Sequence, residues 1–183
     1  MLDLSQSRVS PLPATFATTN VTLTPAPAAS RFILRGDVLA TAGDAFGTAI
    51  PGKPLTSTTT GEKSALWLGP DEWLLLAPEA DTASIYAAVS TAIGSTGALV
   101  DVSHRQTALL IAGPKAATVL NAGVPLDLSL KAFPVGMVTR TIFEKAEIVL
   151  WRTGEENFRL EVWRSFAPYV LALLQAADRD MIQ

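Results

Sequence analysis

The chain has 183 residues, of which 49% are hydrophobic and 17% are charged, so it can bury one compact core and is not disordered over most of its length. Its 14 basic and 17 acidic residues give a net charge of −3 without a long run of either sign, which argues against a nucleic-acid partner. The absence of cysteine excludes disulfides, thiolate nucleophiles and thiolate metal ligands.

The amino-terminal sequence shows no targeting or membrane-spanning pattern. Residues 1–25 lack the basic segment and following apolar run that are typical of a signal peptide. No segment reaches the roughly 20 apolar residues that a membrane-spanning helix needs. We therefore expect a cytoplasmic protein that does not associate with a membrane.

Residues 1–30 are rich in Ser, Thr, Ala and Pro and predict an extended amino-terminal arm. Prolines disfavour a regular helix in this region, and there are four of them: Pro11, Pro13, Pro25 and Pro27. Apolar residues such as Val21 and Leu23 make the arm too hydrophobic for a purely solvated tail. We expect the arm to lie along the domain or along another subunit, with a frayed terminus as the alternative.

Strands and helices alternate from residue 31 onward. In the first half the strand pattern covers residues 31–35, 55–60, 64–68 and 73–77. Asp37 is placed to cap a helix after the first strand, and Asp81 starts a second helix. Three apolar residues share one face of that second helix: Ile85, Val89 and Ile93. This face is expected to cover a sheet.

The second half repeats the same order of elements. Its strand pattern covers residues 99–102, 107–112, 137–143, 147–151 and 158–163. Gly113 and Pro114 open the intervening helix, and Ser165 is placed to cap the last one. We predict a single α+β domain over residues 31–183, duplicated into sub-lobes of about 31–97 and 98–183. An alternating α+β domain without duplication is the alternative.

Asp101, Ser103 and the only histidine, His104, stand close together in the sequence. The members of a Ser-His-Asp triad normally come from distant parts of a chain, and no Gly-x-Ser-x-Gly turn surrounds Ser103. The segment is therefore not interpreted as a hydrolase site. A structural cluster at a strand end and a contact with a ligand or partner both stay open.

Metal and nucleotide sites are not expected in this chain. One histidine and no cysteine make a dedicated metal centre improbable. The glycines form neither a Gly-x-Gly-x-x-Gly nor a Walker pattern, so the chain is not expected to bind a flavin or a nicotinamide cofactor by itself. No residue is assigned a catalytic role.

The predicted strand 158–163 has a second face that is not simple core, because Arg159 and Trp163 alternate with apolar residues. Arg152 and Arg164 stand close to this strand in the sequence. Arginine and tryptophan are favoured at the centres of protein interfaces, so these four residues form a candidate subunit interface. A solvated sheet edge with Arg–Glu pairs is the alternative interpretation.

Several segments resemble a known family. The sequence Asp-Val-Ser-His at residues 101–104 and Gly-Pro-Lys-Ala at residues 113–116 resemble segments of glycine cleavage T proteins and their folate-binding relatives. Phe-Pro-Val-Gly at residues 133–136 fits the same pattern. The resemblance implies a T-protein-like α+β fold in which the two βαββ-type sub-lobes are ferredoxin-like.

Two further segments resemble a narrower family, the gamma subunit of heterotetrameric sarcosine oxidase. They are Leu-Gly-Pro-Asp-Glu-Trp-Leu at residues 68–74 and Glu-Val-Trp-Arg-Ser-Phe-Ala-Pro-Tyr at residues 161–169. This resemblance implies an accessory subunit of an enzyme that oxidatively demethylates sarcosine to glycine, with tetrahydrofolate as one-carbon acceptor. It also implies an alpha-type partner in a complex with beta and delta subunits, whose FAD, FMN, NAD and tetrahydrofolate belong to those partners.

The chain departs from the T-protein pattern where that family carries a paired-Asp motif, because its nearest equivalent is Glu147. The longer glutamate changes the placement of the carboxylate, and the carboxy-terminal domains that complete a T-protein folate cavity are not seen in this sequence. Two alternatives stay open. One is a folate- or pterin-binding module that uses Asp101, His104, Glu147 and Arg164. The other is a minimal aminomethyltransferase with Glu147 as acid/base.

Overall fold

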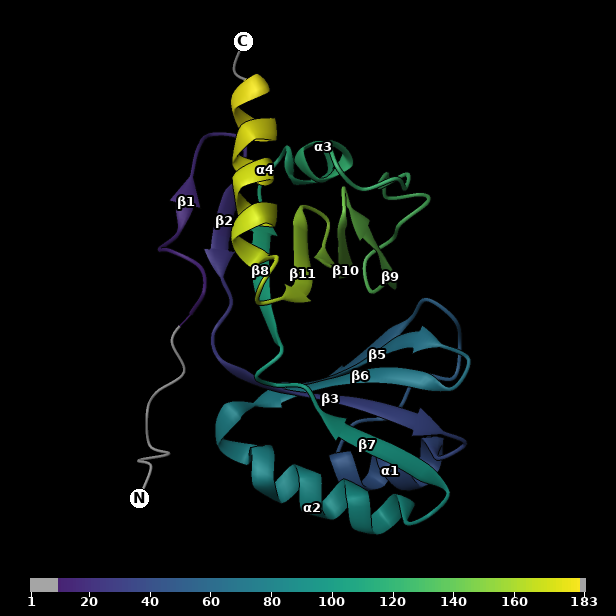
Figure 1. The fold of residues 1–183 in the computed structure, drawn as a ribbon. Helices are drawn as coiled ribbons and strands as arrows, with labels where there is room; N and C mark the ends of the chain where they lie inside the picture. The colour runs from purple at the N-terminus through teal and green to yellow at the C-terminus, as the bar shows by residue number, and fades with distance from the viewer. Residues whose placement is uncertain (1–9, 182–183) are drawn as a thin grey trace, which may run out of the picture.

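The computed structural model describes residues 10–181, which fold into two antiparallel sheets with helices outside them. Figure 1 shows four layers: helices α1 and α2, a five-stranded sheet, a six-stranded sheet, and helices α3 and α4. The expected α+β fold with two related sub-lobes is therefore confirmed at the level of two sheets. The predicted arm begins with residues 1–9, which lie outside the described residues.

The five-stranded sheet has the strand order β4-β5-β6-β3-β7. Its strands are β3 (Ala29–Gly36), β4 (Ser57–Thr60), β5 (Lys63–Gly69), β6 (Glu72–Pro78) and β7 (Gly97–Asp101). Its outer face is covered by α1 (Leu39–Phe46) and α2 (Thr82–Ile93), the latter entered through the 3-10 turn η1 (Glu79–Asp81). The buried residues of α2 are the predicted ones, Ile85, Val89 and Ile93.

The six-stranded sheet has the strand order β1-β2-β8-β11-β10-β9. Its strands are β1 (Phe16–Ala17), β2 (Thr22–Pro25), β8 (Gln106–Ala112), β9 (Val138–Phe143), β10 (Ala146–Gly154) and β11 (Asn157–Trp163). Its outer face is covered by α3 (Ala116–Asn121) and α4 (Ala167–Asp180). The arm joins this sheet, because β2 pairs with β8, and Thr18 donates a hydrogen bond to the buried Asp178 of α4 at 3.1 Å.

The two sheets follow one plan, with a strand of the arm completing the second. Reading inward from β7, the neighbours are β3, β6, β5 and β4; reading inward from β2, they are β8, β11, β10 and β9. Residues 98–101, which the sequence analysis places in the second sub-lobe, pair instead with β3 in the five-stranded sheet. The chain therefore passes from the five-stranded sheet to the six-stranded sheet after Asp101, because β7, the strand that follows α2, pairs with β3.

Two glycines mark this correspondence. Gly36 ends β3 with φ +113°, and a Cβ there would lie 2.7 Å from the Thr96 carbonyl oxygen, just before β7. Gly113 follows β8 with φ +133°, and a Cβ there would lie 2.6 Å from the Asn20 carbonyl oxygen, just before β2. Both positions need glycine because an incoming strand crosses close to the backbone.

The predicted helix caps are not formed by side chains. The residues at the cap positions of α1, α2 and α4 are Val38, Asp81 and Phe166, and none makes a side-chain capping bond. Asp37 and Ser165 each stand one residue before the cap. At α4 the reason is a tight turn, in which the Phe166 N–H bonds the Trp163 carbonyl and leads directly into the helix.

A third apolar cluster fills the space between the sheets. Alternation along each strand directs one set of side chains to the helices and the next set to the opposite sheet. The buried residues of this middle cluster are Leu66, Leu68, Leu74, Leu76, Val102, Val138 and Val149. The same inner faces also carry arginines and glutamates, which form the site described next.

Candidate functional site

A groove opens at the margin of the space between the two sheets. It has a volume of about 290 Å³, and strands of both sheets contribute to its walls. Its charged lining residues are Arg35, Glu72, Arg105, Arg140 and Glu147, and Trp163 lies beside them. The groove therefore combines three cations and two carboxylates with an aromatic surface.

Glu72 joins the two sheets across this groove. Its carboxylate accepts hydrogen bonds from Arg35 of β3 at 2.6 Å and from Arg140 of β9 at 2.5 Å. Burial alone would raise the pKa of Glu72, but the hydrogen bonds and positive charges of Arg140 and Arg35 lower it overall. The bond with Glu72 raises the pKa of Arg140, and attraction to Glu147 adds to this effect. Glu72 is consequently a poor proton acceptor.

A second ion cluster lies deeper between the sheets. The Arg31 Nε donates to Glu161 Oε2 at 2.6 Å, and the side chains of Arg31 and Glu161 are 2% and 1% exposed. Arg159 donates to the same carboxylate at 2.8 Å. Since Arg31 belongs to β3 and Glu161 to β11, this cluster links the five-stranded and six-stranded sheets.

An exposed aromatic patch lies at the junction of β11 and α4. We define it as Trp163, Phe166 and Tyr169, which are 40%, 40% and 39% exposed. The Arg105 guanidinium stands 5.4 Å from the centre of the Trp163 ring, in cation–π geometry. Among the described residues, Arg105 forms no ion pair with a carboxylate. Aromatic and arginine side chains in this arrangement are typical of protein-binding surfaces.

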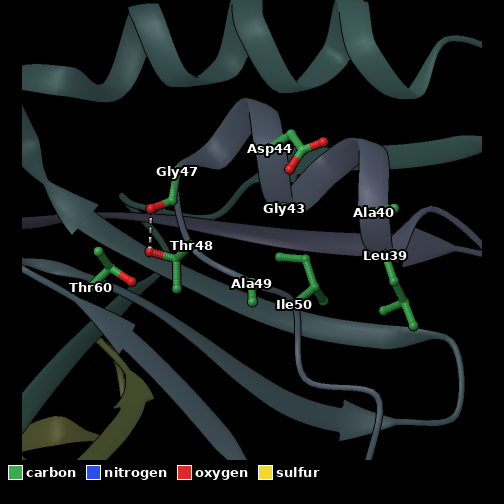
Figure 2. Close-up of a pocket in the computed structure, with 9 residues that line it drawn as sticks. All are labelled: Leu39, Ala40, Gly43, Asp44, Gly47, Thr48, Ala49, Ile50 and Thr60. Carbon is green, nitrogen blue, oxygen red and sulfur yellow. Dashed lines mark hydrogen bonds between the residues drawn. The ribbon is translucent and has the colours of Figure 1, made fainter.

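Another hollow, of about 570 Å³, lies on the far side of the five-stranded sheet between α1 and the segment that follows it (Figure 2). Its walls are mostly small residues of α1 and residues 47–50, and the Thr48 hydroxyl donates to the Gly47 carbonyl at 2.9 Å. Among the described residues, Asp44 is the one charged residue that lines it. Within residues 10–181, the lining of this hollow therefore contains fewer charged side chains than the lining of the groove.

The fold and these sites can be compared with known proteins. Residues 35–180 match the family described as "Sarcosine oxidase, gamma subunit family". The chain belongs to this family. It is 35% identical over 130 residues to the sarcosine oxidase subunit gamma of Corynebacterium sp. (strain P-1), covering 70% of this chain and 63% of that one. It is 36% identical over 117 residues to that of an Arthrobacter species, covering 62% and 56%. The chain thus spans less than two thirds of these relatives.

Solved structures extend the similarity to nearly the whole chain. A chain of the heterotetrameric sarcosine oxidase from Corynebacterium sp. U-96, solved with pyrrole 2-carboxylate, is 29% identical with a TM-score of 0.82. The match covers 95% of this chain and 96% of that one. The glycine cleavage system aminomethyltransferase T of Bartonella henselae matches 83% of this chain and 44% of that one, at 16% identity and a TM-score of 0.65. This second likeness establishes the fold alone.

In this gamma-family chain, the residues proposed for ligand binding do not share one hollow. Glu147 lines the groove between the sheets, Asp101 lines a hollow beside α2, and Arg164 lines a small cavity of about 60 Å³ with Arg31. His104 is exposed in the turn between β7 and β8. A single pocket built from all four residues is therefore not the arrangement in this structure.

The Asp-Val-Ser-His segment forms the connection between the two sheets. Asp101 Oδ1 accepts a hydrogen bond from the Ser103 N–H at 2.8 Å. The buried Ser103 hydroxyl accepts a bond from the Arg31 N–H at 2.8 Å, so it stabilises the crossover. These contacts assign Ser103 a structural role and leave no triad arrangement with His104.

The four predicted interface residues occupy different environments. Trp163 is exposed in the aromatic patch, and Arg164 follows it partly buried. Arg159 points between the sheets toward Glu161. Arg152 is 3% exposed and donates to the Leu128 and Phe133 carbonyls at 2.9 and 2.7 Å. Arg152 stands on the helix-facing side of β10, where its burial makes it inaccessible to a partner. Its hydrogen bonds instead stabilise the segment that precedes β9.

Four charged residues of the groove were not predicted from the sequence: Arg35, Glu72, Arg105 and Arg140. Glu72 is 37 residues from Arg35 and 68 residues from Arg140 in the sequence, so no short-range sequence pattern predicts the cluster. One available signal was the alternation Arg31-Phe-Ile-Leu-Arg35, which places both arginines on one face of a strand.

Within residues 10–181, no group of three or more His, Asp or Glu side chains is arranged to hold a metal ion. In the same range, no helix has both the length and the apolar character required to cross a membrane.

Proposed function

We propose that the chain acts as the gamma-type accessory subunit of a heterotetrameric sarcosine oxidase. The observation that carries this proposal is the match over 95% of the chain, with a TM-score of 0.82, to a chain of such an enzyme. The proposed complex demethylates sarcosine oxidatively to glycine and passes the one-carbon unit to tetrahydrofolate. Its FAD, FMN, NAD and folate sites belong to the partner subunits, and its location is the cytoplasm.

The proposed docking partner is the large alpha-type subunit, in a complex that also holds beta and delta subunits. The aromatic patch supports docking, because it has three aromatic side chains within residues 163–169 that are each about 40% exposed. Arg105 stacked on Trp163 adds a second residue type that is favoured at interfaces. The patch joins the end of β11 to α4, so it is presented by regular elements rather than by a free loop.

The chemistry of the groove also favours an accessory role over independent catalysis. A general base works best when its pKa lies near the working pH. The two arginines that bind Glu72 lower its pKa and hold it ionised. Glu147 is the second carboxylate of the groove, and its exposed position provides no water-excluding environment for a reacting substrate.

The experiment that tests this proposal is purification of the tagged chain from its native cells, followed by mass analysis and an absorbance spectrum. A yellow complex with a large flavoprotein subunit is expected. The variant Trp163→Ala should retain at least about thirtyfold less partner, because a central interface aromatic contributes about 2 kcal/mol or more and about 1.4 kcal/mol corresponds to a tenfold change in affinity. Leu130→Ala is the matched control, since Leu130 is an exposed apolar residue outside the patch at 48% exposure.

A colourless chain purified without partners would refute the accessory role. The isolated chain would then be titrated with tetrahydrofolate, and turnover would be compared with that of Glu147→Gln. Folate binding alone would favour the binding-module alternative. Turnover lost in the variant would favour the aminomethyltransferase.

A further inference from the structure

The strand β7 is an open edge of the five-stranded sheet. In the part of the chain that the structure describes, β7 pairs with β3 alone. The Val102 N–H donates to the Arg31 carbonyl, so Val100, two residues earlier, directs its N–H and C=O groups toward β3. Alternation then directs the N–H and C=O groups of Leu99 and Asp101 away from β3. An unpaired edge of this kind is a template for a further strand.

The second sheet shows what such an edge accepts. There the position of β7 is taken by β2, and β1 pairs with the outer side of β2 through Phe16↔Leu23 and Ala17↔Thr22. The glycines at positions 36 and 113 mark the two places as equivalent. The place beside β7 that corresponds to β1 is not filled by any described residue.

The two sides of β7 offer different chemistry to an added strand. On the helix side, Leu99 and Asp101 line an open hollow of about 690 Å³ with Ala83 and the exposed Tyr86 of α2. Val100, which is 54% exposed, lines both this hollow and, on the opposite side, the groove that contains Arg105. One side is therefore mainly apolar, and the other carries a guanidinium that has no carboxylate partner among the described residues.

We propose that β7 receives an extended segment of the partner subunit as an additional strand. Because side chains of a strand alternate, apolar residues of that segment would pack against Tyr86 and Ala83. The residues between them would place carboxylates next to Arg105, which supplies the charge complementarity. Main-chain bonds to Leu99 and Asp101 provide affinity, as in other cases of strand addition. This inference rests on the proposed function, since it requires a partner subunit.

Hydrogen–deuterium exchange on the intact complex tests the strand addition directly. The amides of Leu99 and Asp101 should exchange at least about tenfold more slowly in the complex than in the isolated chain, because they gain hydrogen bonds. Equal rates in a complex that does form would overturn the strand addition and leave the accessory role intact. Failure to isolate any complex would overturn both. Protection in a homodimer without partner would assign the edge to a second copy and overturn the partner assignment.

A matched pair of substitutions separates the backbone bond from the side chain. Asp101→Pro removes the outward N–H, which an edge strand tolerates, whereas Asp101→Ala removes the side-chain bond to Ser103 and keeps that N–H. The proline variant should retain at least about tenfold less partner than the alanine variant at equal melting temperature. Equal retention by both variants would overturn the proposal.

The charge complementarity has its own pair of variants. Arg105→Glu should weaken partner retention more strongly at low than at high salt, because it reverses the charge beside the proposed carboxylates. Lys115→Glu makes the same change of charge at an exposed position beyond the far end of β8 and should have little effect. Equal effects of the two variants would contradict an acidic segment.

Discussion

Replacing Arg31 with methionine should destabilise the protein strongly, since Arg31 and Glu161 form a buried ion pair between the two sheets. Their side chains are 2% and 1% exposed, and the Nε–Oε2 distance is 2.6 Å. Removing one member of a buried pair costs about 3–5 kcal/mol, because the other charge stays buried. Glu161 would keep its ion pair with Arg159, whose side chain is 16% exposed, so we expect a cost at the lower end of this range, about 3 kcal/mol. At about 2–4 °C per kcal/mol for a domain of this size, Arg31→Met should lower Tm by about 6–12 °C.

The control variant is Arg35→Met on the same strand. Arg35 bonds Glu72 at 2.6 Å, but its side chain is 54% exposed, and Glu72 keeps its bond to Arg140. An exposed pair contributes about 0–1 kcal/mol, so this variant should lose little stability. Urea unfolding of both variants measures the two free energies. A cost below about 1 kcal/mol for Arg31→Met, or equal costs for both variants, would refute the argument that burial decides the effect.

Three further predictions concern other parts of the fold. Gly113→Ala should cost about 1–3 kcal/mol, because φ is +133° and the new Cβ meets the Asn20 carbonyl, whereas Gly61→Ala has no atom within 4 Å and should cost less. Because folding lowers the pKa of Glu72 below its ordinary value of 4.5, the ionised carboxylate stabilises the folded protein above pH 4.5, and this stabilisation is lost as the pH falls below that value. The difference in unfolding free energy between the wild type and Glu72→Gln should therefore shrink in acid. Arg152→Met should cost at least about 2 kcal/mol, because two buried carbonyls lose their donors.

Unfolding titrations check these three predictions, and each has a result that would contradict it. Equal losses of stability for Gly113→Ala and Gly61→Ala would mean that the close approach of the arm does not restrict position 113 to glycine. If the difference in unfolding free energy between the wild type and Glu72→Gln stayed constant from neutral pH to pH 3, the stabilising role of the ionised Glu72 carboxylate would be contradicted. A melting temperature unchanged by Arg152→Met would show that solvent replaces the lost hydrogen bonds.

Local patterns were sufficient to predict most regular elements. The stripe of Ile85, Val89 and Ile93 identified the buried face of α2, because helical periodicity follows directly from the sequence. The entry of β2 into the second sheet could not be predicted in the same way. Thr22–Pro25 pairs with a strand more than 80 residues later, and the threonines and proline of this segment give no register by themselves.

The candidate site was predicted only in part, for a related reason. Trp163 was identifiable because it alternates with core residues on one strand. The network around Glu72 forms only because β3, β6 and β9 lie close together in the fold. The spacing of these residues along the sequence does not predict this proximity. Arg152 was misplaced because sequence proximity to β11 was taken as proximity to its interface side, whereas alternation along β10 directs it to the core of the second sheet.

The ion pairs between the sheets connect the stability of the fold to the proposed docking. The β7 edge belongs to the five-stranded sheet, whereas Arg105 and the aromatic patch are carried by the six-stranded sheet and the segments next to it. A partner that contacts both surfaces requires one fixed relation between the sheets. Apolar contacts alone specify such a relation weakly, whereas Arg31–Glu161 and Glu72–Arg140 impose defined distances across it. We therefore propose that these charge pairs fix the position of one proposed docking surface relative to the other.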